Sequence, residues 1–193
     1  MPLVLVLLVG VLMLPPPRAD AAPVLEDFPA YQPATRCSPH PRPGTLVLAR
    51  FLVRRYGSAV VSLGRRCDPA RSEHGELVTP VTSEHQEGRA IDWAADARTR
   101  AGRRSAQRLL DDLFDTDARG EPAATARRMG VMYVIWDDRI YSAWRGYAPE
   151  PYLSGSCHRR RTCSATLRHR DHVHLSLTRA GARGDTSWFR GRL

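Results

Sequence analysis

The sequence predicts an α+β fold in which a small antiparallel sheet is flanked by helices. Segments with a helical repeat of apolar residues are interspersed with short β-branched and aromatic runs. Residues 131–144 contain two such runs separated by Asp137-Asp138, a pattern typical of a β-hairpin. With 42% hydrophobic and 25% charged residues among 193, the chain has the composition of one globular domain.

The N-terminal segment predicts a signal peptide over residues 1–21. The apolar run Leu3–Leu14 is too short for a membrane span, and Ala19 and Ala21 match the small-residue pattern of a signal peptidase site. No Lys or Arg precedes the apolar run, which is unusual for such a leader. We therefore expect export, a proline-rich extended lead-in over residues 22–43, and a folded domain over residues 44–193.

The first half of the domain predicts one helix and two strands. Leu46–Tyr56 carries apolar residues at helical spacing, with Thr45 as the expected N-cap and Gly57 as its end. The β-branched segment 58–63 predicts a short strand, and the alternation over residues 88–93 predicts another.

The second half predicts two helices and three more strands. Residues 99–114 form an amphipathic pattern, and residues 122–129 form a second helical pattern that ends at Gly130. The hairpin over 131–136 and 139–144 follows. Residues 145–168 predict a long irregular loop, and 172–177 predict the closing strand.

Four cysteines in an exported chain indicate an oxidising compartment and allow three pairings. We favour Cys37–Cys67 and Cys157–Cys163, because the second bridge would close a small ring in the irregular loop. A zinc site made of cysteines is the weaker alternative, since the sequence contains no C-x-x-C pair.

The net charge is +9, and all 29 basic residues are arginine. A basic exported domain would be attracted to anionic polymers. The sequence contains no helix-turn-helix, zinc-finger or RNA-binding aromatic motif, so we expect no nucleic-acid partner.

Two histidine-containing clusters, over residues 83–92 and 169–174, indicate a metal site. Residues two apart share one face of a strand, so His172 and His174 can point to one place, and a turn at Gly88 can bring His85 near them.

A catalytic zinc ion needs three nitrogen or oxygen ligands and one open position. We therefore predict that His85, Asp92 and His174 hold Zn²⁺ in a cleft on the sheet, between the strand after Gly88 and the last strand. His172 or His169 would carry the proton of a hydrolytic reaction.

These clusters resemble those of the LAS superfamily of zinc peptidases, which includes D-Ala-D-Ala carboxypeptidases, murein endopeptidases and lysostaphin-type enzymes. The S-x-H-x-x-G-x-A-x-D pattern matches at Ser83, His85, Gly88, Ala90 and Asp92, and the H-x-H pattern matches at His172 and His174. The resemblance covers residues 44–177. Within the superfamily, the sequence is most similar to a branch of secreted bacterial proteins of poorly defined function.

The resemblance implies the same three zinc ligands and a catalytic role for His172. The carboxypeptidase branch has a glutamate base where this chain has Asp171, whereas the endopeptidase ending H-x-x-H-x-H is reproduced by His169, His172 and His174. The base is therefore open among His169, Asp171 and His172. Asp171 could instead fix the tautomer of a neighbouring imidazole.

On this resemblance we expect a secreted or wall-associated zinc peptidase that hydrolyses peptide bonds in bacterial peptidoglycan, as a D,D-carboxypeptidase or an endopeptidase. Ser83 and Arg89 would bind substrate, although an ion pair within the domain is an equal alternative for Arg89. Anionic wall polymers are a second expected partner, and no membrane partner is expected after leader removal. The alternative is a non-catalytic wall-binding module that retains the peptidase fold.

Overall fold

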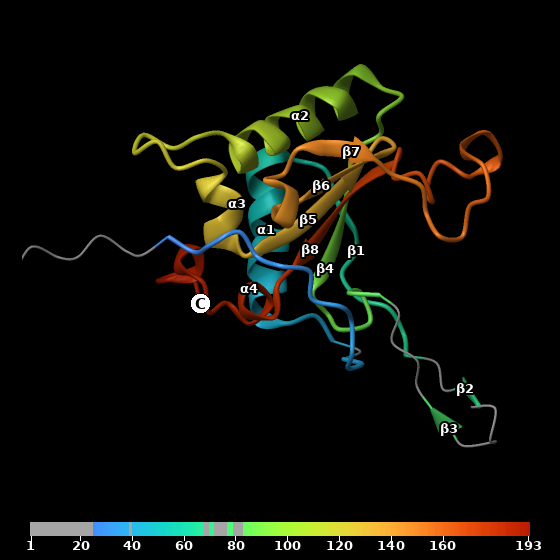
Figure 1. Cartoon of the computed structure of the whole chain (residues 1–193), viewed down its shortest axis with the longest axis horizontal. Helices are drawn as coiled ribbons and strands as arrows, with labels where there is room; N and C mark the ends of the chain where they lie inside the picture. The colour runs from blue at the N-terminus through green and yellow to red at the C-terminus, as the bar shows by residue number, and fades with distance from the viewer. Residues whose placement is uncertain (1–24, 39, 68–69, 72–76, 79–82) are drawn as a thin grey trace, which may run out of the picture.

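The computed structural model describes residues 25–38, 40–67, 70–71, 77–78 and 83–193 (Figure 1). The α-helices are α1 (Pro43–Tyr56), α2 (Arg100–Phe114), α3 (Ala124–Met129) and α4 (Arg179–Arg183). The strands are β1 (Val60–Ser62), β2 (Ala70–Arg71), β3 (Leu77–Val78), β4 (Ala90–Ala94), β5 (Val131–Trp136), β6 (Arg139–Ser142), β7 (Pro149–Pro151) and β8 (His172–Leu177). The predicted signal peptide lies outside the described residues.

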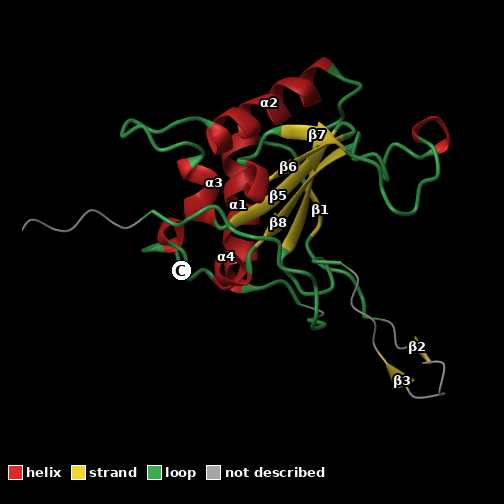
Figure 2. Cartoon of the chain, in the orientation of Figure 1, coloured by secondary structure: helices red, strands yellow, loops and turns green. Residues whose placement is uncertain are grey.

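Six strands form one open sheet in the order β1-β4-β8-β5-β6-β7, and each neighbouring pair is antiparallel. β2 and β3 form a separate two-stranded sheet. Helices flank the main sheet (Figure 2), so the predicted α+β class is confirmed. β8, the last strand in sequence, lies between β4 and β5 in the middle of the sheet.

The helices bury one face of this sheet. Leu48 and Leu52 of α1 and Leu109 and Leu113 of α2 are at most 1% exposed and belong to the main hydrophobic core. The sheet contributes alternate residues to the same core, namely Ile91, Trp93, Val134, Val173 and Leu175. Because side chains alternate along a strand, the residues between them point to the opposite face.

Helix α1 begins at Pro43, three residues before the predicted start, so the prediction that Thr45 is its N-cap is wrong. Arg42 occupies the N-cap, and Pro43 fills the first helical position, where its missing N–H leaves no donor unsatisfied. Thr45 is instead fully buried, and its hydroxyl donates to the carbonyl of Gly88 at 2.9 Å. The end of the helix at Gly57 is as predicted.

The hairpin of β5 and β6 turns at Asp137 and Asp138, both with positive φ (46° and 63°), as a type I′ hairpin turn requires. The second strand is shorter than predicted. It ends at Ser142, and Ala143–Arg145 forms a 3-10 turn. This turn brings the buried Tyr147 back to the sheet, where its hydroxyl donates to the Val131 carbonyl at 2.6 Å.

The segment 145–168 is less irregular than predicted, since it contains β7 and a short 3-10 turn, Arg160–Thr162. Both favoured disulfides are present: Cys37 is bonded to Cys67 and Cys157 to Cys163, with Cα–Cα distances of 6.0 and 5.7 Å. Disulfides of this kind are consistent with an oxidising, extracytoplasmic location.

The described part of the segment before α1 contains no helix or strand and packs on the domain. The carboxylate of Glu26 accepts a hydrogen bond from the hydroxyl of Ser187 at 2.7 Å, and the Glu26 carbonyl accepts one from Arg127 at 2.7 Å. Across the ranges that the structure describes, no helix combines the length and apolar character required to cross a bilayer.

Candidate metal centre

The pairing of β4 with β8 places Asp92 opposite His174 in the middle of the sheet. Their neighbours Trp93 and Val173 are fully buried against the helices. Asp92 and His174 therefore project from the face that the helices leave uncovered. The strand alternation read from the sequence had predicted this shared face, but not the register that makes the two residues partners.

His85 comes from the turn that precedes β4. The backbone N–H of Gly88 donates to the His85 carbonyl at 3.1 Å, and the N–H of Arg89 donates to the Glu84 carbonyl at 3.0 Å. Gly88 has a φ of 69°, a left-handed conformation that glycine adopts at no steric cost. This turn folds the His85 side chain back over the strand that follows it.

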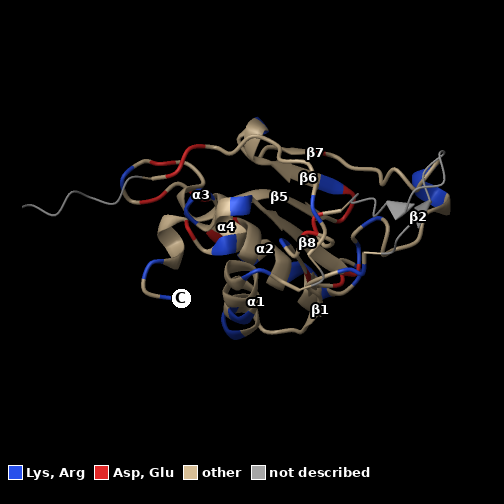
Figure 3. Ribbon diagram, turned by 90° about the horizontal axis from the view of Figure 1, so that it is seen from below, with Lys and Arg blue, Asp and Glu red and all other residues tan. Residues whose placement is uncertain are grey.

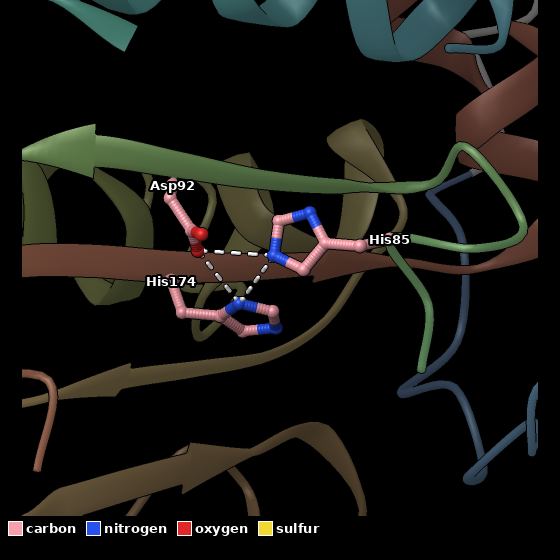
Figure 4. Close-up of side chains that lie close together, drawn as sticks. All are labelled: His85, Asp92 and His174. Carbon is pink, nitrogen blue, oxygen red and sulfur yellow. Dashed lines mark hydrogen bonds and ion pairs between the residues drawn. The ribbon is translucent and has the colours of Figure 1, made fainter. Parts of the chain in front are cut away.

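The three side chains converge on one point (Figure 4). His85 Nε2 lies 3.1 Å from Asp92 Oδ1 and 3.2 Å from His174 Nδ1, and His174 Nδ1 lies 2.9 Å from Asp92 Oδ1. Ligand atoms about 2.0–2.1 Å from a tetrahedral metal ion lie roughly 3.3 Å apart. The His85–Asp92–His174 group, hereafter the metal group, can therefore hold a metal ion.

The electrostatics of the group favour a cation. Burial raises the pKa of Asp92, but hydrogen bonds from His174 and His85 outweigh burial, so the pKa lies well below its ordinary value. Burial lowers the pKa of His174, which the Asp92 carboxylate only partly offsets. A carboxylate and neutral imidazole nitrogens are the protonation states that a metal ion requires.

Two serines orient the imidazoles from behind. The ring nitrogen of His174 that faces away from the group, Nε2, lies 2.9 Å from Ser176 Oγ, and His85 Nδ1 lies 3.5 Å from Ser62 Oγ. A hydrogen bond at the outer nitrogen fixes which nitrogen is left to bind a metal. Neither serine was predicted, although Ser176 follows from the two-residue period of β8.

His172 lies next to the group without belonging to it. Its Nε2 is 3.5 Å from Asp92 Oδ1, and its Nδ1 is 2.7 Å from Asp171 Oδ1. Asp171 also accepts a hydrogen bond from the Thr166 hydroxyl at 2.6 Å. In the neutral tautomer in which Nδ1 donates to Asp171, the lone pair of the imidazole is on Nε2, which lies toward Asp92.

His169 lies in the same neighbourhood, with ring centroids 4.8 Å from His172 and 5.5 Å from His174. Burial, together with the neighbouring His174 and His172, lowers the pKa of His169 to about 3. Its backbone φ of 49° is unusual for a residue other than glycine. Among the described residues, its buried Nδ1 has no hydrogen-bond partner.

Ser83 and Arg89 have structural contacts. Ser83 Oγ accepts from the N–H of His85 at 3.3 Å and so supports the turn. Arg89 is 1% exposed, and its guanidinium contacts Glu84, Glu87 and the carbonyls of Gln32 and Leu177. Arg89 was expected either to bind substrate or to form an ion pair within the domain, and in the structure it forms ion pairs with Glu84 and Glu87.

Glu84 and Tyr133 were missed by the sequence analysis. The Tyr133 hydroxyl donates to Glu84 Oε2 at 2.8 Å, and its ring stacks on His174 with centroids 5.7 Å apart. The other oxygen, Oε1, has no hydrogen bond among the described residues and lies 3.6 Å from Arg89. The only sequence signal was the position of Glu84 directly before His85.

Comparison with known families gives one match. Residues 37–159 match the family model described as VldE, C-terminal domain. The match includes His85 and Asp92 and ends before β8, which supplies His174. No curated protein matches the chain, and no solved structure matches it.

Proposed function

Starting from the fact that the chain belongs to the family of VldE C-terminal domains, we propose that it is a secreted zinc peptidase acting on bacterial peptidoglycan. The observation that carries the proposal is the convergence of His85, Asp92 and His174, from two adjacent strands and a turn, with ligand atoms 2.9–3.2 Å apart. Two imidazoles and one carboxylate are a ligand set that suits Zn²⁺ and leaves a position open.

A zinc ion held there would polarise a scissile carbonyl and lower the pKa of a water molecule. His172 is then suited to carry the proton. Its Nε2 faces the group, while Asp171, itself held by Thr166, fixes the ring and its tautomer. Of the three residues left open as the base, this geometry favours His172, with Asp171 as the residue that orients it.

The substrate class is supported by the residue patterns and by charge. The two histidine clusters resemble those of zinc peptidases that cut peptidoglycan, and the two disulfides fit an exported protein. A net charge of +9 favours association with an anionic cell wall. A hydrolase of another amide or ester, and a non-catalytic wall-binding module, are the alternatives against which the proposal is tested.

The first experiment measures the metal content of purified protein by mass spectrometry of the dialysed chain. We expect about one zinc per wild-type chain, loss of zinc in His85→Ala and His174→Ala, and full zinc content in His158→Ala, an exposed histidine outside the group. A wild-type chain that takes up no zinc after reconstitution would overturn the zinc assignment.

The second experiment digests purified peptidoglycan and measures released peptides and new amino termini. We expect release by the wild type, and a loss of about a hundredfold or more in His172→Ala, which keeps its zinc. His158→Ala should be as active as the wild type. Zinc binding with no release of peptides would favour the wall-binding module, and cleavage of simple amide or ester substrates alone would favour another hydrolase.

A further inference from the structure

A second candidate binding site lies outside the metal group, where the lead-in, the turn before β4 and α4 meet. It is a cavity of about 400 Å³ with a strongly basic lining, in which the charged residues are Arg36, Arg42, Glu87, Arg89, Arg179 and Arg183. None of the three metal-group residues lines it. Basic residues are drawn blue along the ribbon, including those on α4, in Figure 3.

The charges within this cavity do not cancel. Five arginines and a single carboxylate, that of Glu87, line the cavity. In the part of the chain that the structure describes, only two carboxylates outside the lining, those of Glu84 and Asp185, pair with these arginines. One oxygen of Glu87 contacts Arg89, and the other accepts from Thr35 N at 3.1 Å and from Arg36 N at 3.2 Å, and lies 3.4 Å from Arg179 Nη2. The carboxylate is therefore already shared among several donors, and an excess of positive charge remains.

Several donors in the lining are left for a ligand. Among the described residues, the exposed guanidinium of Arg36 has no hydrogen-bond or ion-pair partner. Arg42 uses Nε on the Glu87 carbonyl at 3.2 Å, which leaves both of its terminal nitrogens. Within the described ranges, the Arg183 side chain forms one ion pair, with Asp185, in which both side chains are more than half exposed and which water or an anion can replace at little cost.

Hydrogen bonds between the segments around the cavity hold the backbone that carries these arginines in place. Arg179 Nη2 donates to the Pro33 carbonyl at 2.7 Å and to Thr35 Oγ1 at 3.0 Å, which ties α4 to the lead-in. The N–H of Arg42 donates to the Gly88 carbonyl at 2.8 Å, which ties the start of α1 to the turn before β4. A site whose frame is already ordered loses less entropy when it binds.

We propose that this cavity binds a phosphate group carried by a larger molecule. A phosphate group accepts hydrogen bonds from several guanidinium groups at once, and its negative charge would balance the excess positive charge of the lining. The volume is in the range of small-ligand sites, roughly 300–1,000 Å³, and so leaves room beyond the phosphate itself. The phosphate has two sources, a phosphodiester of an anionic polymer or a free phosphorylated small molecule.

The test measures binding by isothermal titration calorimetry at low salt, with glycerol 3-phosphate, a short poly(glycerol phosphate) and acetate as probes. Arg36→Gln/Arg183→Gln is the test variant. Arg54→Gln/Arg104→Gln removes the same charge from exposed arginines on α1 and α2 and is the matched control. Metal-stripped protein is titrated in parallel, because this site does not depend on the proposed peptidase activity.

We expect both phosphate probes to bind wild-type and metal-stripped protein, and the test variant to bind them about tenfold or more weakly. The control variant should stay within about twofold of the wild type. Tighter binding of the polymer identifies wall phosphodiesters as the ligand, and tighter binding of the monoester identifies a small metabolite. No binding by the wild type, equal losses in the two variants, or acetate binding as tight as phosphate would each overturn the proposal.

Discussion

Arg168 contacts both carboxylate oxygens of Asp138, through Nε at 2.8 Å and through Nη2 at 2.6 Å. The two residues are 30 positions apart and join the tip of the β5–β6 hairpin to the loop before β8. Backbone hydrogen bonds from Asp137 to the His169 carbonyl and from Asp138 to the Arg168 carbonyl reinforce this junction. The hairpin tip thus supports the segment that carries His169, Asp171 and His172.

Removing the charge of Asp138 should weaken this junction in a pH-dependent way. The Arg168 hydrogen bonds lower the pKa of Asp138 below its usual 3.8, although burial opposes the shift. A lowered folded-state pKa adds stability above the usual pKa, and this stability is lost as pH falls through the folded value. We expect Asp138→Asn to cost roughly 1.5–3 kcal/mol at neutral pH in urea unfolding, and progressively less below pH 3.8.

Asp185→Asn is the matched control, since its ion pair with Arg183 is exposed. It should change the free energy of unfolding by no more than about 0.5 kcal/mol at any pH. Equal effects of the two substitutions at neutral pH would contradict the supporting role of Asp138.

Gly88 should be intolerant of a side chain. Its φ is positive, and an added methyl group would meet the carbonyl of His40. We expect Gly88→Ala to lower the melting temperature and the zinc content, because the turn that carries His85 must shift. Gly120 also has a positive φ but open space around it, so Gly120→Ala measures the backbone strain alone. A zinc content in Gly88→Ala equal to that in Gly120→Ala would show that the turn is not needed for the metal group.

Tyr133→Phe should destabilise the chain while leaving metal binding largely intact. The substitution keeps the ring that stacks on His174 but removes the hydroxyl that donates to Glu84. Removing a hydrogen-bond donor from a buried carboxylate lowers the free energy of unfolding by roughly 1–3 kcal/mol. Chemical unfolding and zinc content measured together test this prediction, and a loss of zinc at unchanged stability would contradict it.

The two disulfides should differ in their contribution to stability. Cys37–Cys67 spans 30 residues and Cys157–Cys163 spans 6. Chain-entropy arithmetic gives about 3.6 kcal/mol for the longer loop and about 2.2 kcal/mol for the shorter one. We expect Cys37→Ser/Cys67→Ser to lower the unfolding free energy more than Cys157→Ser/Cys163→Ser, as measured in urea, and the reverse order would contradict the prediction.

Local patterns in the sequence predicted much of the fold. The helical spacing over α2, the hairpin turn at Asp137-Asp138 and the alternation along β4 and β8 are all local, so no knowledge of distant neighbours was needed. Thr45 was misassigned because Pro43 provides an equally local start signal and because the Thr45 hydroxyl has a distant partner, the Gly88 carbonyl. β7 and α4 are too short to leave a clear periodicity.

The metal group was predicted from histidine spacing, but its surroundings were not. Which strand lies beside which depends on pairing between segments about 80 residues apart, so the opposition of Asp92 and His174 could not be derived from either strand alone. The same applies to Tyr133 and Glu84, which meet only because β5 and the turn before β4 lie near β8. The burial of Arg89 depends on the lead-in, which has no periodicity to indicate where it packs.

The central position of β8 has a consequence for how the protein is made. Before the segment from His172 onward has been synthesised, the main sheet consists of two separate pieces. One is the pair of β1 and β4, and the other is formed by β5, β6 and β7. Each piece has an unpaired strand edge that is prone to association. The pairings of β8 with β4 and β5, which join the two pieces, are long-range and therefore slow to form. His174 lies on the same strand, so an incomplete chain has neither a continuous sheet nor all three residues of the candidate metal site.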